Sequence, residues 1–110
     1  AASVVTFEER RRPTIIRTPE GRDLPARGTL WIEDATGRVV GTELRTGNTA
    51  RDQVEATITV TYALVPRLGL LLPASMDERY AGRGTGITCT AVYSNFRRFE
   101  TGARIVRAPQ

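Results

Sequence analysis

The chain has 110 residues, of which 40% are hydrophobic and 25% charged, and its net charge is +4. These values are typical of one soluble globular domain over residues 1–110, and they exclude a disordered or fibrous protein. Every cation is an arginine and histidine is absent, which excludes a lysine Schiff base, a histidine general base and histidine metal ligands. No constellation of catalytic residues stands out, so we expect no enzyme, cofactor or metal; an enzyme that uses carboxylates and arginines alone is the remaining alternative.

The first element in chain order is a strand over residues 3–9, which we expect to continue through residues 14–17. Pro13 lies between the two parts and cannot donate a backbone hydrogen bond, so it predicts an edge position or a bulge. A helix over residues 1–10 is the alternative. Two prolines and a glycine in residues 18–26 predict a connection.

A hairpin follows, with strands over residues 28–33 and 38–45. The turn between them reads Asp34-Ala-Thr-Gly37. Asp at its first position and Gly at its fourth favour a type I turn whose glycine takes the left-handed conformation.

The strongest pattern is the strict alternation of apolar and polar residues over residues 54–64, Val-Glu-Ala-Thr-Ile-Thr-Val-Thr-Tyr-Ala-Leu. Its period of two and its β-branched residues indicate a half-buried strand. At about 3.3 Å per residue the strand would be roughly 36 Å long. We expect it to be central in a sheet.

A turn at residues 65–69 leads to a strand over residues 70–80, in which Pro73 indicates a bulge or an open edge. A glycine-rich turn at residues 81–86 precedes the last long strand, residues 87–99, and residues 104–109 form a short strand or a tail. Cys89, the only cysteine, is interpreted as a small buried hydrophobic residue. The sequence thus predicts a mainly β protein, a curved antiparallel meander of five or six long strands in an open half-barrel.

Apolar residues gather on one predicted face of this sheet, and an open sheet cannot leave so large an apolar surface in water. We expect a lipid-like ligand, a second copy in a homo-dimer or a missing N-terminal segment to cover it. The predicted face consists of Leu30, Ile32, Val54, Ile58, Val60, Tyr62, Leu70, Leu72, Met76, Ile87 and Tyr93. The residues predicted to bind a ligand are Leu30, Ile32, Ile58, Val60, Tyr62, Leu72, Met76 and Tyr93.

The alternative function is binding of single-stranded nucleic acid or another polyanion. Arg97 and Arg98 stand beside Phe96 and Phe99, and stacking rings next to cations suit single strands. Arginines at residues 10–12, 104 and 107 would extend this site into a basic edge if the end strands were neighbours. Charged residues also protect edge strands from aggregation, so the pattern favours nucleic acid less than it favours the apolar ligand.

The stretch Gly-Thr-Leu-Trp-Ile-Glu-Asp-Ala-Thr-Gly-Arg-Val-Val-Gly-Thr-Glu-Leu resembles a pattern of the outer-membrane lipoprotein carriers. Three later stretches resemble the closing strands of uncharacterised exported bacterial proteins, which extends the resemblance over residues 28–99: Ile-Thr-Val-Thr-Tyr, Leu-Pro-Ala-Ser-Met-Asp-Glu-Arg-Tyr and Thr-Ala-Val-Tyr-Ser-Asn-Phe-Arg-Arg-Phe. The resemblance to the carriers implies a curved sheet of the bacterial envelope or periplasm that holds acyl chains and catalyses no reaction. The lid helices and early strands of that family are missing, which implies the C-terminal part of a longer protein.

Overall fold

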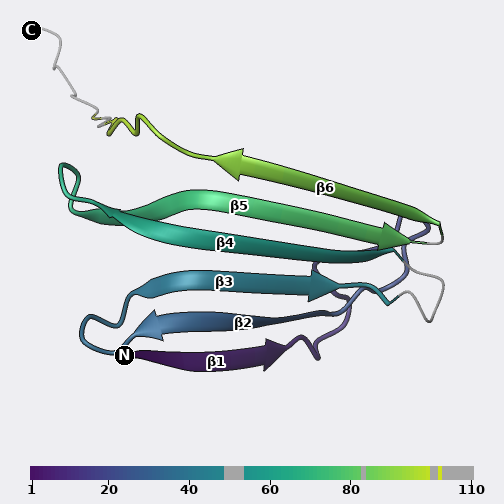
Figure 1. Cartoon of the computed structure of the whole chain (residues 1–110). Coiled ribbons are helices and arrows are strands. Elements are labelled where there is room, and N and C mark those ends of the chain that lie inside the picture. The colour runs from purple at the N-terminus through teal and green to yellow at the C-terminus, as the bar shows by residue number, and fades with distance from the viewer. Residues whose placement is uncertain (49–53, 83, 100–101, 103–110) are drawn as a thin grey trace, which may run out of the picture.

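The computed structural model describes residues 1–48, 54–82, 84–99 and 102. Within them the chain forms strands and no helix. The strands pair in chain order, so β1 and β6 are the two edges of one open antiparallel sheet (Figure 1). This confirms the predicted mainly β meander. The strands are β1 (Ala2–Glu8), β2 (Ala26–Glu33), β3 (Val39–Thr46), β4 (Glu55–Val65), β5 (Leu70–Gly82) and β6 (Thr85–Val92).

The hairpin and the long central strand are confirmed. Gly37 has a φ of 70° and its N–H donates to the carbonyl of Glu33 at 2.8 Å, which closes the turn between β2 and β3. The alternating segment forms β4, which pairs along its length with β5 and with β3 on its other side. A strand in this place has its backbone groups bonded on both sides, and its β-branched residues suit that position.

The predicted ends of two other strands are wrong. β1 stops at Glu8, and residues 9–25 form a loop with only an isolated bridge between Arg17 and Asp23. β6 stops at Val92 instead of residue 99, and residues 93–99 leave the sheet as irregular chain. The predicted terminal strand at residues 104–109 lies outside the described residues.

The pairing register separates two faces, because residues directly opposite each other on neighbouring strands point to the same side. One face, called the apolar face below, carries Val5, Phe7, Leu30, Ile32, Leu44, Ala56, Ile58, Val60, Met76, Tyr80, Ile87 and Ala91. The other, called the polar face, carries Thr6, Glu8, Arg27, Thr29, Glu43, Arg45, Thr57, Thr59, Thr61, Ser75, Asp77, Arg79, Thr88 and Thr90.

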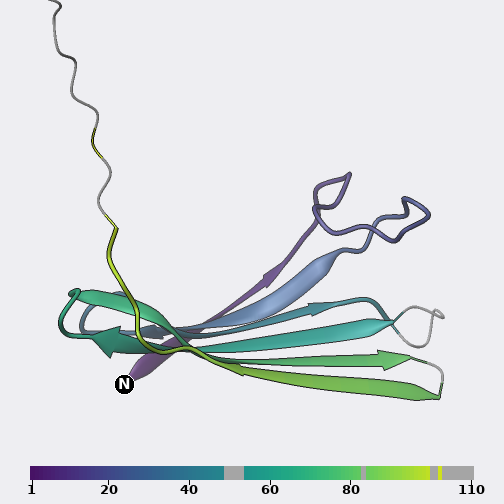
Figure 2. The same ribbon diagram turned by 90° about the horizontal axis from the view of Figure 1, so that it is seen from above.

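The sheet is a single layer. β1 and β2 bend away from the plane of the other strands and carry their connecting loop to one side (Figure 2). Among the described residues no hydrophobic side chain is buried, and the buried polar residues are Thr14 and Thr46. Globular domains pack at least two layers around a core. The apolar face of this sheet therefore lies open.

Candidate functional site

The apolar face follows from the alternation of each strand and from the register that aligns the strands. Leu44 of β3 lies opposite Ile58 of β4, and Val60 of β4 lies opposite Met76 of β5. These side chains are half-buried by one another alone, and those nearer the edges are more exposed: Phe7 is 40% and Ile87 59% exposed. The result is an apolar surface to which all six strands contribute side chains.

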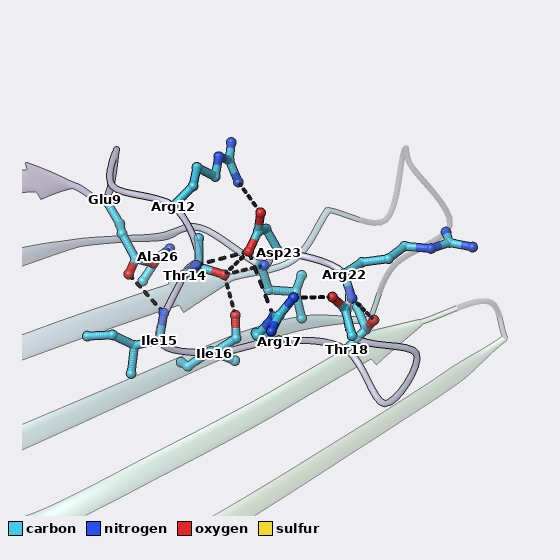
Figure 3. A network of polar contacts seen from close by, with 12 residues as sticks. Glu9, Arg12, Thr14, Ile15, Ile16, Arg17, Thr18, Arg22, Asp23 and Ala26 are labelled. Atoms are coloured by element: carbon cyan, nitrogen blue, oxygen red, sulfur yellow. Dashed lines mark hydrogen bonds and ion pairs between the residues drawn. The ribbon is translucent and has the colours of Figure 1, made fainter.

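The loop of residues 9–25 stands beside one end of this surface and is held by buried polar contacts (Figure 3). Thr14 is only 4% exposed; its hydroxyl donates to the carbonyl of Ile16 at 2.7 Å and accepts the N–H of Leu24 at 2.9 Å. The Asp23 carboxylate accepts the N–H of Thr14 at 2.9 Å. Local bonds of this kind satisfy a backbone that has no neighbouring strand.

The Asp23 carboxylate also lies between two arginines. One carboxylate oxygen lies 3.7 Å from a guanidinium nitrogen of Arg12, and the other lies 3.9 Å from a guanidinium nitrogen of Arg17. Both arginine side chains are about half exposed. The bond from the Thr14 N–H, followed by the bond from its hydroxyl and the two arginines, lowers the pKa of Asp23 below 3.8, although partial burial opposes this shift. Exposed ion pairs contribute little. The bond to Thr14 is therefore the main restraint.

Glu9 joins the two ends of the loop by hydrogen bonds. Its carboxylate accepts the N–H of Ile15 at 3.1 Å and the N–H of Ala26 at 3.0 Å, and its own N–H donates to the carbonyl of Ala26 at 2.7 Å. Ile15 and Ile16 line a pocket together with Phe7, Glu9, Ala26 and Leu44. The pocket has a volume of about 410 Å³ and an almost wholly apolar lining. The pocket extends the apolar face from the sheet onto the loop.

A small polar group interrupts the apolar face on β5 and β6. Glu78 lies opposite Cys89, and Tyr80 follows on the same side of β5. Partial removal from water, together with the charge of Glu78, raises the pKa of the Tyr80 phenol above 10.0. The phenol is therefore neutral in the physiological range and can donate a hydrogen bond. Cys89 is exposed, so its predicted burial is wrong.

Most of the predicted ligand-binding residues lie together on the apolar face. Leu30, Ile32, Ile58, Val60 and Met76 share it by register. Tyr62 joins them by the alternation of β4, and the Tyr93 hydroxyl lies 3.9 Å from the sulfur of Met76. Ile87 also lies on this face, opposite Tyr80. Val54 precedes β4 and is 58% exposed.

Leu72 and Leu70 do not belong to the apolar face. Ser75 pairs with Thr61 but Pro73 pairs with Tyr62, so β5 holds one extra residue, Ala74, at this point. Such a bulge reverses the alternation beyond it. Leu71, opposite Leu64, therefore takes the position predicted for Leu72, while Leu72 and Leu70 lie on the opposite face with Ala63 and Val65.

The predicted basic edge is wrong in its arrangement. Residues 10–12 follow β1 and residues 97–98 follow β6, and these strands are opposite edges of the sheet (Figure 1). Phe99 is 83% exposed, Arg97 and Arg98 are exposed, and the carbonyl of Phe96 accepts a hydrogen bond from Arg67. Residues 104 and 107 lie outside the described residues. Polyanion binding by residues 96–99 alone stays a prediction.

The sequence reasoning did not identify the polar face as a site. An acidic residue and an arginine two positions apart occur in β3, Glu43 and Arg45, and again in β5, Asp77 and Arg79. The strand between them carries Thr57 and Thr59, and the register places all six residues side by side. The acidic residue and arginine two positions apart, repeated in the strands before and after the alternating strand β4, could have indicated this polar group from the sequence.

Comparison of the chain with protein-family models, with curated proteins and with solved structures finds no match. In the described ranges no helix is long and apolar enough to cross a membrane. The same residues contain no group of three or more acidic, cysteine or histidine side chains placed to hold a metal ion.

Proposed function

We propose that this chain is a non-enzymatic binding domain of the bacterial envelope whose apolar face takes a lipid-like ligand. The observation that carries the proposal is the separation of the two faces: apolar side chains from all six strands gather on one face, and among the described residues only the loop of residues 9–25 lies over it, at one end. The resemblance of residues 28–99 to lipoprotein carriers supports the same class of ligand and the same compartment.

The free energy of burying apolar side chains favours a ligand or partner that covers this face. Complete burial of one Val, Leu, Ile, Phe or Met side chain contributes about 1.5–3 kcal/mol. Roughly ten such side chains left half exposed forgo on the order of 10 kcal/mol, which equals the whole stability of a typical domain, about 5–15 kcal/mol. A ligand or partner that supplies the second layer would recover this free energy.

The pocket beside the loop favours an elongated apolar ligand over a flat protein surface. Its volume of about 410 Å³ lies within the range of small-molecule sites, roughly 300–1,000 Å³. Ile15, which is 93% exposed, and Ile16 stand above Phe7 and Leu44. An acyl chain lying along the sheet could place its end between them. The loop would block the close approach of a second flat sheet.

The test combines two measurements on the purified chain. Organic extraction followed by mass spectrometry detects lipid retained during purification, and titration with the fluorescent fatty acid cis-parinaric acid measures binding. Light scattering during size-exclusion chromatography gives the oligomeric state of the same sample.

Retained lipid, or saturable binding of the fatty acid by a monomer, is the expected result. A dimer that carries no lipid and excludes the fatty acid would assign the apolar face to a second copy and overturn the lipid proposal. A monomer that binds neither would overturn it as well.

A further inference from the structure

The polar face holds an ordered group of six side chains on its three central strands. The register places Arg45, Thr57 and Arg79 in one row across the strands, and Glu43, Thr59 and Asp77 in the next row. These six residues line a hollow with a volume of about 270 Å³. Each row thus has a threonine hydroxyl at its centre, between two guanidinium groups in one row and two carboxylates in the other.

The hollow continues into a larger one over β1 and β2. The second hollow, of about 690 Å³, shares Glu43 and Arg45 with the first and reaches Thr29 and Thr6. Its remaining walls are Phe7, Glu8, Arg10, Arg27 and Gly28. Together the two form a groove that crosses five strands, about 19 Å at a strand spacing of about 4.8 Å. The groove runs across the strands, so its walls are side chains from separate strands.

Charge in the groove is nearly balanced. Its arginines are Arg10, Arg27, Arg45 and Arg79, and its carboxylates are Glu8, Glu43 and Asp77. Arg45 pairs with Glu43 at 2.6 Å, and Arg27 pairs with Glu55 beside the groove at 3.7 Å. A phosphate or sulfate could bond only to the guanidinium groups and would lie beside the carboxylates, whereas an uncharged ligand that both donates and accepts can use both kinds of group. An uncharged polar ligand also avoids repulsion by the carboxylates.

Over its central strands the groove can bind a ligand only through side chains. The backbone N–H and C=O groups of β2, β3 and β4 are bonded within the sheet, and the free strand edges are those of β1 and β6. Threonine hydroxyls both donate and accept, carboxylates accept at two oxygens and guanidinium groups donate in a fork. This mixture matches pairs of neighbouring hydroxyl groups on a sugar ring. Arg79 has no ion pair or hydrogen bond within the described residues, so its donors are available.

The only tryptophan lies on this face next to the groove. Trp31 follows Thr29 by two positions on β2 and is opposite Gly41, and its ring lies 3.4 Å from the place where a Cβ of Gly41 would be. The Trp31 ring is half-exposed and lies in van der Waals range of β3 at Gly41. A flat aromatic surface beside hydrogen-bonding groups suits the apolar face of a sugar ring.

From this arrangement we propose that the polar face binds an uncharged glycan chain. The glycan lies across the strands in the groove, its hydroxyls bond to Asp77, Arg79 and their neighbours, and one sugar ring packs on Trp31. The site is separate from the apolar face and does not depend on what that face binds.

The experiment uses the full chain and a panel of uncharged oligosaccharides, including cellohexaose and chitohexaose, with heparin hexasaccharide as the anionic probe. Binding is followed by the fluorescence of the single tryptophan and by isothermal titration calorimetry. The test variants are Asp77→Ala and Arg79→Ala. The matched control is Arg38→Ala, because Arg38 is an exposed arginine in the turn between β2 and β3.

At least one uncharged oligosaccharide is expected to bind and to change the Trp31 fluorescence. Each test variant is expected to lose about tenfold in affinity, because a hydrogen bond to a charged group contributes about that much, while Arg38→Ala keeps the affinity of the unchanged chain. If no uncharged oligosaccharide binds, or if binding survives in both test variants, the proposal is overturned. Binding of heparin alone would overturn it too and would assign the groove to polyanions.

Discussion

The Asp23 carboxylate accepts the backbone N–H of Thr14 at 2.9 Å and so joins the two arms of the loop between β1 and β2. Because this bond and the nearby arginines lower the pKa of Asp23 below 3.8, the folded loop favours the ionised carboxylate. Its stabilising contribution is therefore complete above about pH 3.8 and is lost as the pH falls through the lowered folded pKa.

We accordingly expect hydrogen exchange of the loop amides, corrected for the intrinsic rate, to be constant from neutral pH to about 4 and to accelerate below the folded pKa. Asp23→Ala should give fast exchange at every pH and faster cleavage by trypsin after Arg17 and Arg22. Glu20→Ala removes an exposed carboxylate from the same loop and serves as the control. A loop equally protected in Asp23→Ala would refute the role assigned to the carboxylate.

Substitution of Gly28 tests the packing where β1, β2 and β3 meet. A Cβ on Gly28 would lie 2.3 Å from the backbone oxygen of Glu43 and 2.6 Å from the ring of Phe7. The strand cannot move away without breaking its pairing, so we expect Gly28→Ala to lower the free energy of unfolding by about 1–3 kcal/mol, the usual cost of overpacking. Urea denaturation measures the change.

Gly86→Ala is the matched control for that substitution. Gly86 also lies in a strand, β6, but a Cβ there would meet no atom within 4 Å. Its replacement should leave the urea midpoint unchanged or raise it slightly, because alanine restricts the unfolded chain more than glycine does. Equal destabilisation by the two substitutions would contradict the contact geometry at Gly28.

The parts of this fold that the sequence predicts depend on local patterns. Alternation over residues 54–64 and the Asp34–Gly37 turn each specify their structure within a few residues, and both are confirmed. The connection predicted at residues 18–26 is confirmed, but residues 14–17 were predicted as strand and belong to the same loop. The structure of that loop depends on the Asp23 carboxylate reaching a backbone group nine positions away. A single hydrogen bond of that kind produces no periodic pattern in the sequence from which it could be predicted.

Two errors concerning the candidate sites have a non-local origin. The extra residue Ala74 exchanged the faces of Leu71 and Leu72, and a bulge is defined by the partner strand as much as by its own sequence. The arginines at the two ends of the chain would form one basic edge only if the end strands were neighbours, and a meander that never closes separates its first and last strands. Closure of a sheet cannot be derived from the strand patterns alone.

Cys89 provides a chemical measure of whether the apolar face is covered. Its side chain is exposed and lies on that face opposite Glu78. We expect a thiol reagent such as DTNB to react with Cys89 at the rate of an exposed cysteine in the chain without ligand, and about tenfold or more slowly once cis-parinaric acid is bound, because burial blocks access to the thiolate. An unchanged rate in the presence of bound fatty acid would place the ligand elsewhere.

Ile58 and Thr61 allow the two faces to be compared within one strand. Ile58 lies between Leu44 and Glu78 on the apolar face, and Thr61 lies between Gly41 and Ser75 on the polar face. An aspartate at residue 58 would place a second carboxylate beside Glu78, without a cationic partner, at the centre of a surface that becomes buried when ligand or partner binds, which costs several kcal/mol. Ile58→Asp should therefore abolish folding or assembly and fatty-acid binding.

Thr61→Asp introduces the same charge three residues away on the polar face, with no charged side chain directly opposite, so its effect on the free energy of unfolding should stay within about 1 kcal/mol. Circular dichroism reports folding of both variants, and light scattering reports their assembly. Because the two substitutions differ only in the face they change, unequal damage measures the asymmetry between the faces directly. If Ile58→Asp stays folded, assembled and competent to bind the fatty acid, the apolar face is not the binding surface.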